Sequence, residues 1–236
     1  MRESLDRQLN QLKNEVLLLD SIVEQAILNS VDALKRRDLR MARRVIEEDH
    51  DINEKRYAIE NAILTLIATQ QPIAARDLRL VASMLEIIGE LERIGDYAKG
   101  IAKITENIGS AQVMIPLTEI SRMCDLSVSM LHRALSAFVN VNEAQARRIP
   151  PEDTEVDALY ESAYKLVIKS MSNNPETIAR GNQIMWALHN LERMADRVSN
   201  ICERTVFIAT GELLEFDSGI EEDDEAEDET GSQTPR

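Results

Sequence analysis

The sequence predicts an all-α protein made of two tandem three-helix bundles that are related by internal duplication. Long stretches of the 236-residue chain are rich in Leu, Ile, Ala, Glu and Arg, which favour helices. Aromatic residues make up only 3% of the chain, and runs of β-branched residues between turn signals are missing. One motif, Leu-Glu-Arg-x-x-Asp, begins at Leu91 and again at Leu191. Helical composition and a repeated motif together indicate a duplicated helical unit.

Three long helices are expected in the first half of the chain. Asp38 suits the N-cap of the second helix, because its carboxylate can accept hydrogen bonds from first-turn amides. Pro72 interrupts the helical pattern, since proline has no amide hydrogen and clashes with the preceding turn. Gly109 and Ser110 end the third helix. The helices are therefore expected over residues 4–37, 38–69 and 74–108.

Three further helices are expected in the second half. Pro116 suits a first helical turn, and Asn142 can cap the next helix. Pro150-Pro151 breaks or kinks that helix. Asn174-Pro175-Glu176 is a helix start signal, and Gly211 is a natural C-terminal stop. The expected helices cover residues 116–141, 142–171 and 174–211.

The last helices of the two halves align when the sequence is shifted by 100 residues. The apolar positions of the two segments then superpose with a spacing of three and four residues, which is typical of packed helices. A shift of 104 aligns the middle helices and pairs Asp49 with Asp153 and Asn53 with Asp157. The domains are therefore expected at residues 1–110 and 111–212. The identical pairs under the first shift are Leu91/Leu191, Glu92/Glu192, Arg93/Arg193, Asp96/Asp196, Ile101/Ile201, Thr105/Thr205 and Ile108/Ile208.

The net charge of −15 is concentrated in the last residues of the chain, where residues 212–236 hold eleven Asp and Glu and one Arg. We expect residues 213–236 to form a disordered acidic tail, because they contain few apolar residues to bury. The remaining body is mildly acidic, which argues against nucleic-acid binding. No leader or membrane-spanning stretch is visible, and Cys124 and Cys202 fit buried thiols of a reducing compartment, so a cytoplasmic location is expected.

Four pairs of acidic or amide side chains stand four residues apart on predicted helices. Residues at this spacing share a helix face, and two carboxylates there repel unless a cation neutralises them. The helical phase places Glu92/Asp96 and Glu192/Asp196 away from the packing seam, on an outward face. Oxygen ligands suit hard cations such as Mg²⁺, Ca²⁺, Mn²⁺ or ferric iron. A solvated acidic face without metal is the alternative reading. The pairs are Asp49/Asn53, Glu92/Asp96, Asp153/Asp157 and Glu192/Asp196.

The sequence offers no catalytic motif. A di-iron carboxylate enzyme needs two Glu-x-x-His motifs, and only Glu47 and His50 supply one, because Ser129 and Trp186 precede the other two histidines at that spacing. Glycine-rich phosphate loops, nucleophile elbows and Cys–His pairs are also missing. The chain is therefore expected not to be an enzyme.

Two segments carry recognisable motifs: Pro72-(x)4-Asp77-Leu78-Arg79 followed by residues 92–98, and residues 191–201 in the second half. In these segments the chain resembles the PhoU family of bacterial phosphate-transport and phosphate-regulon accessory proteins. The resemblance covers residues 1–212 and implies a pair of three-helix bundles with surface Glu/Asp-x-x-x-Asp motifs that bind metal. Iron is the first choice of metal, with zinc, manganese and magnesium as further candidates. Carried over by position, the eight residues of the four pairs are the metal ligands, although Asn53 is a neutral and weaker ligand.

The resemblance also implies a regulatory role. Members of the family repress the phosphate-starvation response by contacting the ATPase of the phosphate importer and a sensor histidine kinase. The chain is accordingly expected to be a homodimer that reaches the membrane only through its partners. Two alternatives stay open from the sequence, a metal-dependent helical carboxylate enzyme and a metal-free helical adaptor.

Overall fold

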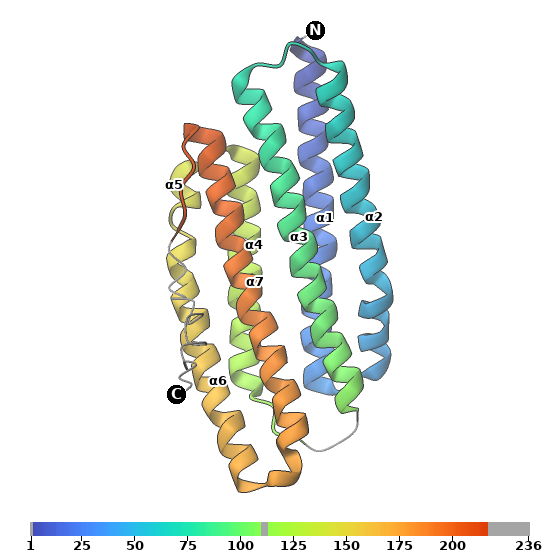
Figure 1. Ribbon diagram of the computed structural model, residues 1–236, viewed down its shortest axis with the longest axis vertical. Coiled ribbons are helices and arrows are strands. Elements are labelled where there is room, and N and C mark those ends of the chain that lie inside the picture. The colour runs from blue at the N-terminus through green and yellow to red at the C-terminus, as the bar shows by residue number, and fades with distance from the viewer. Residues whose placement is uncertain (1, 110–112, 217–236) are drawn as a thin grey trace, which may run out of the picture.

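The first half of the chain forms three long antiparallel helices, as the sequence predicts. The computed structural model describes residues 2–109 and 113–216, and this part of the chain is helical with no strand. The helices are α1 (Arg2–Arg36), α2 (Leu39–Thr69) and α3 (Ala75–Ile108). All three run along the long axis of the molecule (Figure 1).

The second half repeats this arrangement with one difference. Its long helices are α4 (Leu117–Asn140), α6 (Asp153–Asn173) and α7 (Ile178–Thr210). The helix expected from Asn142 is divided into a single-turn helix, α5 (Glu143–Ala146), a 3₁₀ turn at Pro150–Glu152, and α6. The two consecutive prolines explain the division, because they remove two amide donors from an α-helical ladder.

The predicted helix ends are occupied by the expected residues. Asp38 accepts hydrogen bonds from the amides of Arg40 and Met41, at 2.9 and 3.1 Å. Asn142 accepts one from the Gln145 amide at 3.1 Å, so both side chains are N-caps. Gly211 ends α7 with φ of 83°, a left-handed conformation that glycine adopts without the strain of a side chain.

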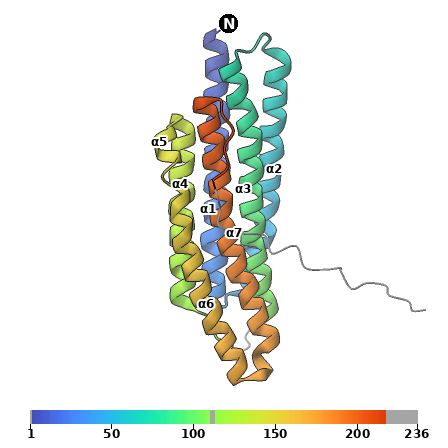
Figure 2. The ribbon, with the colours of Figure 1, turned by 60° about the vertical axis from the view of Figure 1, so that its left-hand side comes forward.

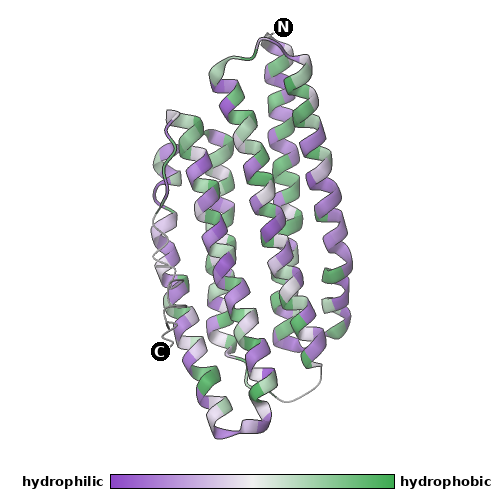
Figure 3. Ribbon diagram, viewed as in Figure 1, coloured by the Kyte–Doolittle hydropathy of each residue, from purple (hydrophilic) through white to green (hydrophobic). Residues whose placement is uncertain are grey.

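The two bundles share one hydrophobic core rather than two separate ones. The most extensive contact between long helices joins α3 to α7, and α1 also touches α4. Helices α3 and α7 therefore lie in the middle of the six, which Figures 1 and 2 show from two sides. One contiguous buried cluster contains apolar side chains from all six long helices, and a small separate cluster lies among α1, α2 and α3. Each helix accordingly carries both apolar and polar residues along its length, as Figure 3 shows.

The structure also bears on the two cysteines, on membrane spans and on the segment that follows α7. Cys124 and Cys202 are buried free thiols, as predicted. Within the described residues, no helix has the length and apolar character needed to cross a bilayer. Of the predicted tail, residues 213–216 are non-helical, and the Phe216 amide donates a hydrogen bond to Glu203 Oε1 at 2.7 Å. Residues 217–236 lie outside the described part of the chain.

Candidate metal centre in each half

The first-half residues of the predicted site lie between α2 and α3. Asp49 is buried on α2 with 6% of its surface exposed, while Asp96 on α3 is exposed and Glu92 is intermediate. The Asn53 side chain donates to Asp49 Oδ2 at 3.2 Å, and also to the Asp49 carbonyl at 3.0 Å. Partial burial, and then the charge of Asp96, raise the pKa of Glu92. The structure thus brings Asp49, Asn53, Glu92 and Asp96 to one patch, called here the first-half patch.

A lysine occupies this first-half patch. Lys99 Nζ on α3 lies 2.6 Å from Asp49 Oδ2 and 3.9 Å from Asp96 Oδ1. The hydrogen bond to Asp49 raises the pKa of Lys99, to which the charges of Asp49, Asp96 and Glu92 also contribute. The lysine is therefore fully protonated at neutral pH and supplies a positive charge among three carboxylates.

The corresponding second-half patch consists of Asp153 and Asp157 on α6 and Glu192 and Asp196 on α7. Asp153 and Glu192 are only 6% and 9% exposed. Burial, followed by the charges of Asp196 and Asp157, raises the pKa of Glu192 to about 7. Burial also raises the pKa values of Asp153, Asp157 and Asp196, and the Asp153 carboxyl is hydrogen-bonded to that of Asp196. Four acids with raised pKa values lie close together where no lysine lies among them.

The outward orientation predicted for the second motif is wrong for Glu192. Asp96 does point into solvent, but Glu192 is buried and Asp196 is only partly exposed. The prediction considered one packing seam on each helix. Helix α7 instead contacts α3, α4 and α6 at once, so a side chain beside the seam is covered by a second neighbour.

The second-half patch has the chemistry that a hard cation requires. Asp153 Oδ1 is buried and has no hydrogen-bond partner, which is costly unless a cation or water completes its environment. Among the described residues, however, no three His, Cys, Asp or Glu side chains converge as ligands of a single ion. A cation on these carboxylates would therefore retain water in part of its coordination shell, as Mg²⁺ and Mn²⁺ commonly do. The residues that would hold it are Asp153, Asp157, Glu192 and Asp196.

Comparison with known proteins assigns the chain to a family. The family model described as "PhoU domain" matches twice, at residues 5–105 and 120–205. The chain belongs to the PhoU family. The two matches confirm the internal duplication that the repeated motif predicted.

Relatives of this PhoU-family chain match it over nearly their whole length. The "Phosphate-specific transport system accessory protein PhoU homolog" of Streptococcus pneumoniae serotype 4 is 35% identical, over 92% of this chain and 100% of that protein. The homolog of Clostridium acetobutylicum is 32% identical, over 91% and 98%. The crystal structure of the phosphate transport system regulatory protein PhoU from Streptococcus pneumoniae superposes with a TM-score of 0.83 at 34% identity, covering 90% and 100%.

Two residues beside the PhoU-family motifs were not anticipated from the sequence. Lys99 follows Asp96 by three positions, and His189 precedes Glu192 by three, so each shares a helix face with an acid of the motif. His189 Nδ1 lies 3.2 Å from Glu192 Oε2. Burial, and then the charge of Arg193, lower the pKa of His189, which keeps the imidazole neutral at pH 7. A search for basic residues three positions from each acid would have found both.

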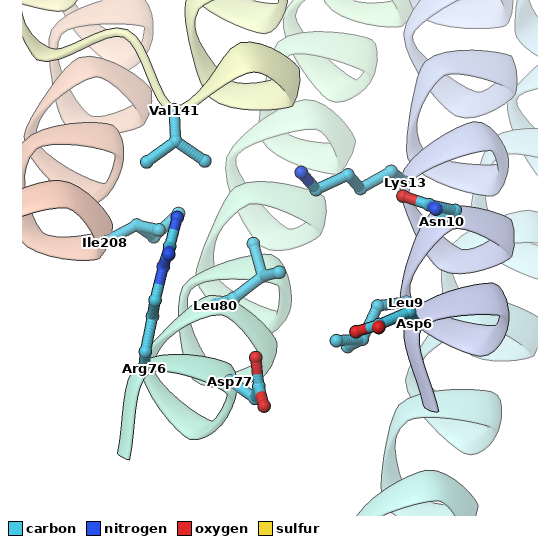
Figure 4. Close-up of a pocket in the computed structure, with 9 residues that line it drawn as sticks. All are labelled: Asp6, Leu9, Asn10, Lys13, Arg76, Asp77, Leu80, Val141 and Ile208. Carbon is cyan, nitrogen blue, oxygen red and sulfur yellow. The ribbon is translucent and has the colours of Figure 1, made fainter. Parts of the chain in front are cut away.

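The PhoU-family chain also has a pocket of about 250 Å³ at one end of the junction between its halves. Lys13 and Arg76 approach it from α1 and the start of α3, together with Asp6 and Asp77 (Figure 4). Burial, and then the charge of Arg76, lower the pKa of Lys13. Two cations and two carboxylates leave the lining without a formal net charge. The lining residues are Asp6, Leu9, Asn10, Lys13, Arg76, Asp77, Leu80, Val141 and Ile208.

Proposed function

We propose that this chain is a cytoplasmic regulator of phosphate uptake that represses the phosphate-starvation response when phosphate is abundant. The observation that carries the proposal is the match along both repeats to proteins named as phosphate-specific transport system accessory proteins. The match covers at least 98% of each of these two relatives, so the proposal is supported by both repeats and not by one alone.

The proposed partners are the ATPase of the phosphate importer and the sensor histidine kinase. An elongated bundle of six long helices offers long faces on which two such proteins can dock. Among the described residues, several large apolar side chains are exposed on these helices, including Trp186 at 57% and Tyr57 at 55%. Such residues are frequent in protein interfaces. We also propose that the chain is a homodimer and acts without catalysing a reaction.

Hard metal ions are part of the proposal, with iron first and zinc, manganese or magnesium as alternatives. The second-half patch supports it best, because the buried Asp153 oxygen lacks a partner and four oxygen ligands lie on two facing helices. A bound cation would supply positive charge that holds α6 against α7, which makes its role structural or sensory rather than catalytic. A carboxylate enzyme would be favoured instead if hydrolase or redox activity depended on Glu192.

The regulatory proposal is tested in a strain that lacks the gene for this chain. Expression of a phosphate-starvation reporter in high phosphate is expected to rise in the deletion strain, and the wild-type gene should restore repression. Pull-down of the importer ATPase and the sensor kinase with the tagged chain tests the partners. A deletion strain that still represses the reporter in high phosphate would contradict the proposed function.

Metal binding is tested separately by elemental analysis of the purified full-length chain. Wild-type protein is expected to contain metal, and Glu192→Ala, which removes one proposed ligand, is expected to contain less. The exposed Asp51→Ala on α2 serves as the matched control, since Asp51 is outside the four pairs. Absence of metal from the wild-type protein would refute this part of the proposal and leave the regulatory part standing.

A further inference from the structure

The two candidate centres differ in charge, first at the position of Lys99. In the first-half patch, Lys99 Nζ contacts Asp49 Oδ2 at 2.6 Å and is within 3.9 Å of Asp96 Oδ1. Under the shift of 100 residues that superposes Leu91 on Leu191, Lys99 corresponds to Ser199. Ser199 is buried, with 5% exposure, and carries no charge. The second-half patch therefore has no equivalent of the ammonium group.

A second difference also makes the second-half patch more negative than the first-half patch. Asn53 donates its amide hydrogen to Asp49 Oδ2 at 3.2 Å, the same oxygen that Lys99 contacts. Its counterpart under the shift of 104 is Asp157, which brings a carboxylate instead of a donor. Asp49 Oδ2 thus has two donors, whereas Oδ1 of its counterpart Asp153 has none. Asp49 Oδ2 is therefore already satisfied, whereas the buried Oδ1 of Asp153 is not.

A metal ion would have to displace Lys99 to bind in the first half. The ammonium group occupies the space between Asp49 and Asp96, and a divalent cation at the same carboxylates would be repelled by it at short range. Releasing Lys99 would also leave its charge in a partly buried position, because only 27% of its side chain is exposed. In the second half no lysine has to leave. Arg193 and Arg197 act on Asp196 there, but the buried Asp153 oxygen without a hydrogen-bond partner would gain one.

We infer that Lys99 is a built-in cation that replaces metal in the first half, so that the loaded protein carries metal only at Asp153, Asp157, Glu192 and Asp196. The inference rests on the proposed metal binding and specifies which repeat performs it. The duplicated halves then have distinct roles. The α2–α3 pair is held by a permanent charge, while the α6–α7 pair responds to the available metal.

Loss-of-binding variants of the full-length chain identify the loaded half, with Mn²⁺ alone as the probe. Bound Mn²⁺ is measured by electron paramagnetic resonance, since the signal of the free aquo ion falls on binding. Asp157→Asn/Asp196→Asn is expected to weaken Mn²⁺ binding by roughly tenfold or more. The matched first-half variant, Asp49→Asn/Glu92→Gln, is expected to bind as the wild type does. Circular dichroism verifies that both variants are folded.

A gain-of-binding variant completes the test. Lys99→Ser/Asn53→Asp gives the first half the residues that the second half has, and bound Mn²⁺ at saturation is expected to roughly double. A misfolded protein cannot produce this gain. Unchanged binding by this variant, or loss of binding in the first-half variant Asp49→Asn/Glu92→Gln, would overturn the inference alone. A wild-type chain that binds no Mn²⁺ would instead refute the proposed metal binding, and the inference with it.

Discussion

Replacing Asp20 by Asn should reduce the pH dependence of the stability of this protein. Asp20 lies on α1 with 6% of its surface exposed, and its Oδ1 has no hydrogen-bond partner. Burial, and then the charge of Glu24, raise the pKa of Asp20 to about 8. In the unfolded chain the pKa of an aspartate is about 3.9. Between these values the folded chain retains a proton that the unfolded chain has lost.

The sign and size of the effect follow from this difference. The contribution of Asp20 to stability is fully present below about pH 4 and is lost as the pH rises to about 8. Each pH unit in that interval lowers the free energy of unfolding by about 1.4 kcal/mol. The wild type should therefore lose roughly 3 kcal/mol of stability through this group between pH 5 and pH 7. Asn cannot ionise. The free energy of unfolding of Asp20→Asn, relative to the wild type, should therefore increase by that amount between the two pH values.

Urea unfolding at pH 5 and pH 7, followed by circular dichroism, measures the difference directly. Titration of other groups cancels, because only the wild type minus variant difference is compared at each pH. The exposed Asp51→Asn serves as control and should show the same difference from the wild type at both pH values. A relative stability of Asp20→Asn that stays constant within about 1 kcal/mol would show that Asp20 is not a buried neutral acid.

Three further predictions concern packing, capping and the thiols. Leu191→Ala should lower the free energy of unfolding by about 2 to 5 kcal/mol, since its side chain has 0% exposure in the shared core; a loss below about 1 kcal/mol in urea unfolding would contradict that packing. Asp38→Ala should cost about 1 kcal/mol by removing the cap of α2, whereas Asp38→Asn should cost much less, and equal losses would refute the capping role. Burial raises the pKa values of Cys124 and Cys202 to about 12, so Ellman's reagent should label neither thiol of the folded chain at pH 8 but both in guanidinium. Rapid labelling without denaturant would contradict their burial.

The helices and the duplication could be predicted from the sequence because both depend on local chemistry. Asp38, Asn142 and Gly211 act at helix ends through their own backbone neighbours, so their roles can be predicted without a tertiary structure. The repeated Leu-Glu-Arg-x-x-Asp motif likewise indicated two related bundles, which the double match to the family model supports. The pairing of acids four residues apart is also a property of a single helix.

The burial of the motif acids and their contacts with cations depend on how the helices pack. Glu192 is buried because α7 contacts three long helices, which the phase of one helix could not indicate. Lys99 reaches Asp49 across fifty residues of sequence, and only the packing of α2 on α3 brings the two together. Local sequence patterns therefore predict the helices and the eight candidate residues. The packing of the helices places Lys99 against Asp49 in one repeat and leaves a buried Asp153 oxygen without a partner in the other, because burial and long-range charge contacts arise only between helices.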